Sequence, residues 1–186
     1  SDLAPLVAER RLLFWTVDDA EQELLDRIGL LGSIPDLGHD GGFSVAVTNA
    51  GASKIDVFLD RRVATRLEVG PDGDRRLIAD VTLANSAPAS GLPTEVIGNV
   101  IGLPPGTSRL WVSFYGPEAL IRATLDGEPL GLEPQREAGW GAFAHFLTLG
   151  PGESAEYTLE FDLGPRTDDG GPSDGTDDVT RFDQPL

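Results

Sequence analysis

Chemistry-bearing residues gather in the stretch 49–62, which carries Lys54, the only lysine of the chain. Ser53 precedes Lys54, and a desolvated lysine can activate a serine hydroxyl as a nucleophile. Neighbouring residues of an extended strand point to opposite faces, however, so this pair is badly placed for proton transfer. The simpler interpretation is an ion pair between Lys54 and Asp56, two residues apart on one face.

The chain has two histidines, His39 and His145. Neither belongs to a spacing such as His-Glu-x-x-His, and His145 lies among aromatic residues, which predicts a satisfied core or rim residue. The chain has no cysteine, which removes disulfides, thiol nucleophiles and cysteine zinc sites. The sequence therefore assigns no catalytic residue and no metal ligand.

Carboxylates are abundant, with 31 aspartates and glutamates. Glycoside hydrolysis needs two of them, about 5 to 10 Å apart across a cleft, and the sequence neither places nor excludes such a pair. We predict no cofactor but leave calcium open, because several acidic groups could supply oxygen ligands although none fits the EF-hand loop. For Asp72 and Asp74 a turn is sufficient explanation. The other candidate acids are Asp36, Asp40, Asp168, Asp169, Asp174, Asp177 and Asp178.

Exposed aromatic side chains would offer a different kind of site, a platform for sugar rings. Core packing explains most aromatic residues. In the strand predicted over residues 110–115, however, Val112 and Phe114 are expected to occupy the inner face. Trp111 and Tyr115 alternate with them and are expected to point outward. The other aromatic candidates are Trp140 and Phe143. Together, the candidate binding residues are Lys54, Asp56, Arg61, Asn85, Trp111 and Tyr115.

The net charge of −17, from 14 basic and 31 acidic residues, limits the classes of partner. Phosphate backbones need clustered basic side chains, so no nucleic-acid partner is expected, and anionic lipid is disfavoured for the same reason. No apolar run approaches the roughly 18 residues of a membrane helix, so we expect no membrane contact by these residues. The chain lacks methionine, which indicates a piece excised from a longer protein. Its Arg-, Ala- and Gly-rich composition indicates GC-rich coding, as in actinobacteria, ahead of adaptation to high salt.

The elements that must position these residues are mainly strands. The apolar run 12–17 predicts a strand covered on both faces. A short amphipathic helix follows, with Asp18 as its cap, Glu21 completing a capping box and Gly29 ending it. Its apolar stripe is Leu24, Leu25 and Ile28.

Alternating apolar residues predict the later strands, and turn residues predict their connections. Residues 63–84 form a hairpin around the turn 70–74, and Asp126-Gly127 is a second hairpin turn. The other predicted strands cover residues 43–48, 110–115, 120–125, 140–149 and 156–163. Seven or more strands at this spacing predict an antiparallel β-sandwich, immunoglobulin-like in general architecture.

From Ile55 to Val69 almost every second residue is apolar or Thr, and Arg61 is the charged exception in this row. One uninterrupted strand would point it into the core, at a cost unless a carboxylate meets it. We therefore favour a bulge or bend at residues 60–62 over a buried Arg61.

The chain divides into a lead-in over residues 1–9, one sandwich-type domain over 10–163, and a tail over 164–186. The tail is acidic and rich in Gly, Asp and Pro, which predicts disorder. Within the domain, residues 85–106 show little regular structure. A loop of this length usually has a role, so it is the best loop candidate for a binding surface.

Several short sequence motifs of this chain occur together, in this order, in a known family. They are Arg10-Arg-Leu-Leu-Phe-Trp15 with Asp19 and Gln22, Asn49-x-x-x-Ser-Lys-x-Asp-x-Phe-Leu-x-Arg61, Leu83-x-Asn-x-Ala-Pro-x-x-Gly-Leu-Pro93 with Gly98, and Pro105-Gly106 before Val112-Ser-x-Tyr-Gly116. Over residues 10–163 the chain resembles the C-terminal portion of the uncharacterised actinobacterial envelope proteins grouped as domain of unknown function four-zero-one-two. Thr94-Glu95 departs from the family where an aromatic residue is expected.

The resemblance implies a place rather than an activity. Family members look like single-pass membrane proteins with a large domain outside the cell, so this chain would be the last part of an extracellular or cell-envelope domain. The resemblance brings no catalytic residues with it.

Two functions follow as hypotheses. The first is a non-catalytic extracellular module that binds or scaffolds a cell-envelope glycan, wall polymer or protein. The second is part of an envelope hydrolase or transferase whose site is completed by an N-terminal domain, with Lys54, Asp56 or Arg61 contributing. Convergence of these residues and Asn85 with a histidine in one pocket would favour the enzyme; purely local backbone bonds of Asn49, Asp56 and Asn85 would favour the scaffold. Calcium-supported folding or adhesion is a third hypothesis, and the oligomeric state is left open.

Overall fold

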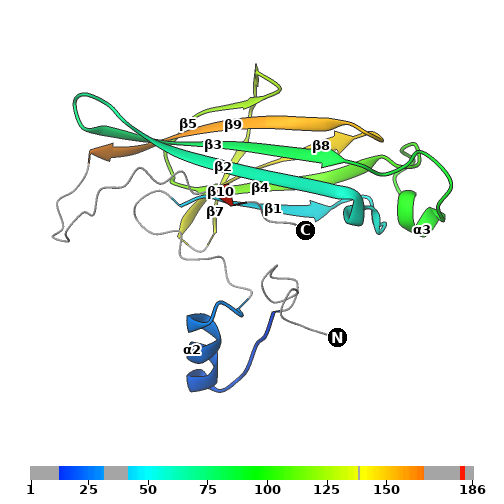
Figure 1. Ribbon diagram of the computed structural model, residues 1–186, viewed down its shortest axis with the longest axis horizontal. Helices are drawn as coiled ribbons and strands as arrows, with labels where there is room; N and C mark the ends of the chain where they lie inside the picture. Colours follow the sequence, from blue (N-terminus) through cyan, green and yellow to red (C-terminus); the bar gives the residue numbers. More distant parts are fainter. Residues whose placement is uncertain (1–12, 32–41, 138, 166–180, 183–186) are drawn as a thin grey trace.

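Two antiparallel sheets pack face to face in the computed structural model, which describes residues 13–31, 42–137, 139–165 and 181–182 (Figure 1). Within these residues the first sheet has four strands in the order β1 (Ser44–Asn49), β4 (Ser108–Gly116), β8 (Trp140–Leu149) and β7 (Glu133–Glu137). The second has six, in the order β10 (Arg181–Phe182), β2 (Leu59–Val69), β3 (Asp74–Asn85), β9 (Ser154–Pro165), β5 (Leu120–Leu125) and β6 (Glu128–Pro129). The predicted antiparallel sandwich is confirmed.

The core lies between the sheets and is built from one row of side chains on each strand. The two clearest rows belong to β4 and β9, where every second residue is buried. Phe114 of β4 meets Tyr157 of β9 with ring centroids 5.0 Å apart, and Phe143 of β8 meets Phe161 of β9 at 5.9 Å. Each such ring contributes about 1.5–3 kcal/mol by leaving water, so these rows fix how the sheets face each other.

The N-terminal unit differs from the prediction. Residues 13–17 form no strand, and Leu13, Phe14, Trp15 and Val17 are exposed. The backbone N–H of Phe14 donates to Leu30 O at 2.9 Å. An apolar run becomes a covered strand only where neighbouring strands pair with it, and none of the described strands pairs with residues 13–17.

Helix α2 (Asp19–Arg27) forms where predicted, because both of its ends are capped locally. Asp18 accepts from the N–H groups of Ala20 and Glu21, both at 3.0 Å. At the other end, Gly29 has a φ of +72° and Leu30 N–H donates to Leu25 O, which together complete a Schellman motif.

The apolar stripe of α2 is only partly covered, however, because Leu24 and Ile28 are exposed and Leu25 is half-buried. No residue of the helix is buried, and Figure 1 shows α2 apart from both sheets. The expected capping box also differs, because the Glu21 carboxylate accepts from Thr16 Oγ1 at 2.8 Å and Asp18 N–H donates to the same hydroxyl at 3.3 Å.

The β2–β3 hairpin is confirmed, but the bulge predicted at residues 60–62 is wrong. The ladder runs without a shift from the Leu59–Asn85 pair to the Val69–Arg75 pair, and β2 begins only after the short 3-10 helix η1 (Ile55–Phe58). The register shift lies instead at Arg75/Arg76, on the side of β3 that pairs with β9. Arg61 therefore shares the inner row of β2.

Some elements were not predicted. The loop 85–106 contains the single turn of α3 (Thr94–Ile97), and β7 is an exposed edge strand. In the predicted tail, residues 166–180 and 183–186 lie outside the described residues. Arg181 and Phe182, which are described, pair as β10 with Ala64 and Val63 of β2.

Candidate binding face

The outer face of the four-stranded sheet carries the aromatic residues that the sequence placed there. Because Leu110, Val112 and Phe114 are fully buried, the alternate residues Trp111 and Tyr115 of β4 point away from the core. The predicted outward orientation is thus confirmed. Phe143 shares the inner row of β8 and is buried, so this aromatic candidate is wrong.

Trp111 belongs to a compact cluster with β8. Phe146 lies opposite it in the β4–β8 register, and the two rings meet edge to face with centroids 4.6 Å apart. Arg109 places its guanidinium 4.5 Å from the Phe146 ring centroid and donates to Thr148 Oγ1 at 2.6 Å. Phe146 is 52% exposed, so its ring offers an apolar surface with the hydrogen-bonding Arg109 guanidinium beside it.

Tyr115 makes a second aromatic position on the same face. Its hydroxyl donates to Glu137 of β7 at 2.7 Å, and burial, that hydrogen bond and the carboxylate charge raise the pKa of Tyr115. The hydroxyl is therefore protonated at neutral pH. Trp140 shares the outward parity of β8 and is half-buried, near the Glu137 that it pairs with in register.

A strip of small side chains separates the two aromatic positions. Ala46, Ser113 and Ala144 lie opposite one another across β1, β4 and β8. Trp111 and Tyr115 flank this strip, four residues apart and so roughly 14 Å apart along β4. We call the surface formed by Arg109, Trp111, Ser113, Tyr115 and Phe146 the aromatic face.

The stretch from Asn49 to Asp56 is a turn rather than a strand. Asn49 Nδ2 donates to Ser53 O at 2.8 Å and to Asp56 Oδ2 at 3.1 Å, and its Oδ1 accepts from Gly51 N–H at 2.7 Å. Among the described residues, the structure forms no ion pair between Lys54 and Asp56 within 4.0 Å, so that interpretation is wrong. The reason is that η1 replaces the expected strand.

The buried side chain of Asn85 has a structural role, because it hydrogen-bonds backbone groups of two separate loops. Its Nδ2 donates to the carbonyl oxygens of Gly106, Leu149 and Gly150 at 2.8, 3.0 and 3.0 Å, and its Oδ1 accepts from Ala87 N–H at 3.1 Å. Three of these partners are distant in sequence, so the amide holds the long loop and the β8–β9 turn together. All are backbone groups, which leaves no side-chain chemistry at this position.

Arg61 bridges the two sheets. Its Nη1 donates to Val45 O of β1 at 2.7 Å, and burial lowers the pKa of the guanidinium. A cation facing inward from a strand is tolerated because a carbonyl of the opposite layer meets it. The expected alternative of a buried Arg61 is therefore nearer the structure than the bulge, with Val45 O as one of its partners.

His145 is a core residue, as predicted. Its Nε2 lies 3.0 Å from Tyr157 Oη, and its ring stacks at 6.5 Å on Phe114. Burial, followed by the charge of Arg109, lowers the pKa of His145. His39 lies outside the described residues. Among the described residues, the structure does not bring Lys54, Asp56, Arg61 and Asn85 into a pocket with His145.

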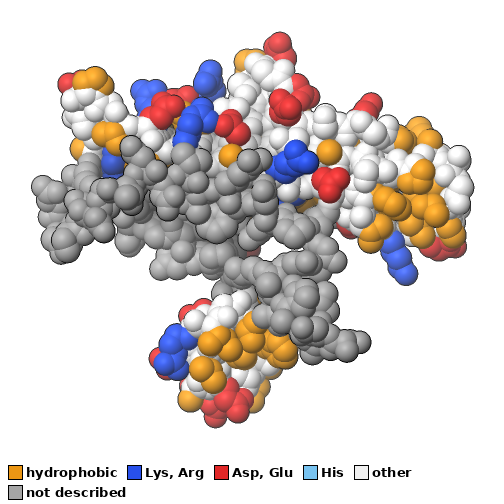
Figure 2. All heavy atoms as spheres, viewed as in Figure 1, with side chains coloured by type: hydrophobic (Ala, Val, Ile, Leu, Met, Phe, Trp, Pro, Cys, Tyr) orange, Lys and Arg blue, Asp and Glu red, His pale blue; other side chains and the backbone are white. Residues whose placement is uncertain are grey.

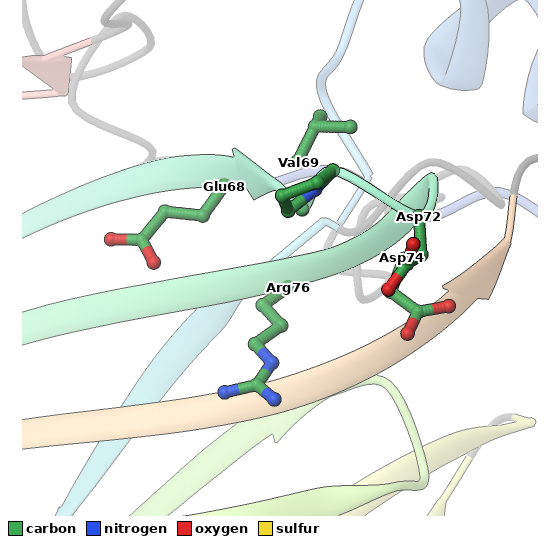
Figure 3. Close-up of a pocket in the computed structure, with 7 residues that line it drawn as sticks. Glu68, Val69, Asp72, Asp74 and Arg76 are labelled. Atoms are coloured by element: carbon green, nitrogen blue, oxygen red, sulfur yellow. The ribbon is translucent and has the colours of Figure 1, made fainter.

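In the described part of the chain, two pockets are lined by none of Lys54, Asp56, Arg61, Asn85 and His145. One of about 310 Å³ surrounds the β2–β3 turn, and one of about 390 Å³ adjoins β7 and β8. Figure 3 shows that Asp72 and Asp74 project from the turn of the first pocket, whereas Glu68 directs its carboxylate away from them. In the part of the chain that the structure describes, no three or more His, Asp or Glu side chains gather as a metal site. Asp36, Asp40 and the tail acids fall outside that part.

Comparisons with protein-family models, curated proteins and solved structures give no significant match for this chain. The family resemblance stated from its sequence phrases therefore stays a prediction. Within the described ranges, no helix has the length and apolar character needed to cross a bilayer.

Sequence reasoning missed Arg109 and Phe146 as members of the aromatic face, and Glu137 as the partner of Tyr115. Phe146 and Glu137 meet Trp111 and Tyr115 only through strand pairing, Arg109 meets Phe146 across the β4–β8 pair, and β7 was not predicted at all. The parity of Phe146 against the buried Leu147 and Leu149 was the available signal.

Proposed function

We propose that this chain is a non-catalytic recognition module that binds a cell-envelope glycan through the aromatic face. The observation that carries the proposal is the pair of outward aromatic positions, Trp111 with Phe146 and Tyr115 with Glu137, on either side of a strip of small side chains. Sugar rings present apolar C–H faces and hydroxyl edges. A ligand of this kind needs flat aromatic surfaces with fixed polar groups beside them.

The polar groups of the face are arranged for neutral hydroxyl recognition. Arg109 and Thr148 form a hydrogen-bonded pair at one aromatic position, and Tyr115 and Glu137 form another. These partners hold each other in place on paired strands, so little side-chain entropy is lost when a ligand binds. The net charge of −17 favours an uncharged ligand over a polyanion.

A non-catalytic role is supported by the placement of the reactive residues. Asn85 bonds only backbone groups, Asn49 and Asp56 bond each other within one turn, and His145 belongs to the core. The extracellular, actinobacterial and membrane-anchored setting rests on the family resemblance alone. It makes wall polysaccharide the glycan class to test first.

The test is binding of the chain to a glycan array and to isolated actinobacterial cell walls. Trp111→Ala should weaken binding by about tenfold or more, because a truncated aromatic anchor commonly costs more than about 1.4 kcal/mol. Trp15→Ala is the matched control, since Trp15 is exposed on the N-terminal unit and should leave binding unchanged. Circular dichroism of each variant checks the fold.

Two results would overturn the proposal. One is an absence of binding to every glycan and wall preparation. The other is release of soluble fragments from a wall substrate by the purified chain, which would favour the hydrolase instead.

A further inference from the structure

A group of aliphatic side chains is exposed at the end of the sandwich that carries α3. They are Val57 at 75% exposure, Val100 at 76%, Ile101 at 50% and Leu92 at 41%. Figure 2 shows hydrophobic side chains gathered over this end of the molecule. We call these four residues the loop crest. Contiguous exposed apolar side chains of this kind commonly mark an interaction surface.

The loops that carry the crest are held rigidly. Lys54 N–H donates to Glu95 O at 3.1 Å and Val100 N–H donates to Gly51 O at 3.2 Å, which ties the two crest loops together. Asn99 closes its own loop through Leu103, donating to its carbonyl at 2.9 Å and accepting from its N–H at 2.8 Å. The crest is therefore presented in one conformation, which lowers the entropic cost of association.

The two crest loops carry few charges in a strongly acidic chain. Within residues 49–58 and 85–107 the charged residues are Lys54, Asp56 and Glu95, and the adjoining β8–β9 turn adds the exposed Glu153. Asp56 is engaged by Asn49, whereas Lys54 and Glu95 are exposed and adjacent through their backbone bond. The crest is thus an apolar surface with one cation and one anion at its rim.

This composition selects among the surfaces that could cover the crest. A bilayer interface favours Trp, Tyr and several basic residues, and the crest loops offer Lys54 alone. Two copies of a chain with a net charge of −17 repel each other, and the charge-poor end is where they approach at least cost. A two-fold contact also requires each residue to find its complement on the same patch, which a neighbouring Lys54 and Glu95 provide.

We propose that the loop crest pairs with the crest of a second copy to form a two-fold dimer. In this dimer the aliphatic side chains meet at the centre, and Lys54 of each copy faces Glu95 of the other at the rim. The aromatic face lies on the sheet rather than on these loops, so each copy keeps its proposed binding surface.

The first experiment is sedimentation velocity over a concentration series at moderate ionic strength. The wild-type chain should show a reversible monomer–dimer equilibrium, and Val100→Asp should weaken dimerisation by at least about tenfold, because it places like carboxylates in the contact. Val69→Asp is the matched control, since Val69 is also exposed but lies at the far end of β2. A wild-type chain that stays monomeric at all concentrations overturns the proposal.

The second experiment tests the two-fold pairing of charges. K54E and E95K should each dimerise more weakly than wild type, because each creates like-charge contacts at the rim. An equimolar mixture of K54E and E95K should recover dimerisation, since opposite charges then meet across the interface. Failure of the mixture to recover, with both variants folded by circular dichroism, contradicts the proposed geometry.

Vesicle flotation completes the test. Association with neutral phosphatidylcholine vesicles that Val100→Asp abolishes would make the crest a membrane surface instead, and so would overturn the dimer. Binding of wall glycan by Val100→Asp should equal that of wild type, which keeps this proposal separate from the function of the aromatic face.

Discussion

The contact between His145 Nε2 and Tyr157 Oη joins the two sheets across the core at 3.0 Å. Burial disfavours the charged form of each partner, so the pKa of His145 is lowered and that of Tyr157 is raised. The charge of Arg109 lowers the pKa of His145 further, and that of Asp126 raises the pKa of Tyr157. Both side chains are therefore neutral at pH 7, and their contact is a neutral hydrogen bond.

The lowered pKa of His145 makes the stability of the domain depend on pH. The unfolded imidazole binds a proton near its ordinary pKa of 6.5, whereas the folded one resists protonation. Stability should be fully present above about pH 6.5 and should fall as the pH drops toward the folded pKa, because the unfolded state binds more protons. Thermal melts between pH 7.5 and 5.5 measure this as a decrease in Tm.

His145→Gln provides the comparison for that prediction. Glutamine can bond Tyr157 and does not titrate, so its Tm should change less over the same pH range. His39 is present in both chains and contributes equally. Parallel pH profiles of the two proteins would show that His145 is not the group responsible.

Arg61 and Asn85 show what residue patterns can and cannot predict. The parity of β2 placed Arg61 on the inner row, but nothing in the local sequence reveals that Val45 O lies across the sandwich to receive it. Asn85 was singled out, yet its role depends on Gly106, Leu149 and Gly150, which only the fold brings to it. In both cases the local sequence identified the residue as a candidate, but its role depends on groups that are distant in the sequence.

At the scale of elements, the loop between β3 and β4 depends on glycines with different requirements. Gly102 and Gly106 have nearly the same positive φ, +78° and +79°. A Cβ at Gly102 would meet nothing within 4 Å. A Cβ at Gly106 would lie 2.5 Å from Pro88 O, because the loop passes directly over the backbone there.

This matched pair separates conformational strain from steric exclusion. Gly102→Ala should lower the free energy of unfolding by about 1–2 kcal/mol, the cost of a positive φ for a residue with a side chain. Gly106→Ala should cost about 2 kcal/mol more, because overpacking against backbone adds to the same strain. Urea denaturation of both variants measures the difference. Equal losses would mean that the loop moves away from Pro88 at little cost.

Elements were predictable where their signal was local. Helix α2 has both caps within its own sequence, and β9 alternates cleanly from Ser154 to Asp162. The strand expected at residues 12–17 failed because an apolar run needs a sheet to join. β7 escaped prediction because all five of its residues are exposed and one is Pro134, so it lacks apolar alternation and exists only by pairing with β8.

At the scale of the whole molecule, charge is distributed unevenly around a neutral core. Acidic and basic side chains mix on the outer face of the six-stranded sheet, where Arg66 pairs with Asp80, and Arg76 and Arg122 both reach Glu160. Figure 2 shows both signs of charge along the upper side of the view. The exposed Arg66–Asp80 pair contributes about 0–1 kcal/mol and weakens in salt, whereas Glu160 is only 12% exposed and its two pairs are screened less. The repulsion among the excess carboxylates of a chain with a net charge of −17 opposes this stabilisation.

The balance of these two effects predicts the response of stability to salt. Screening removes a few weak attractions but also relaxes the net repulsion, which acts over a Debye length and disfavours the compact state. Tm should therefore rise by roughly 2–4 °C, equivalent to about 1 kcal/mol in a chain of this size, between about 20 and 500 mM NaCl. Differential scanning calorimetry measures the rise, and KCl at equal ionic strength should reproduce it if screening is the cause. The Val100→Asp background removes any contribution from dimerisation. A Tm that falls with salt in that background would mean that the ion pairs of the six-stranded sheet outweigh the excess negative charge.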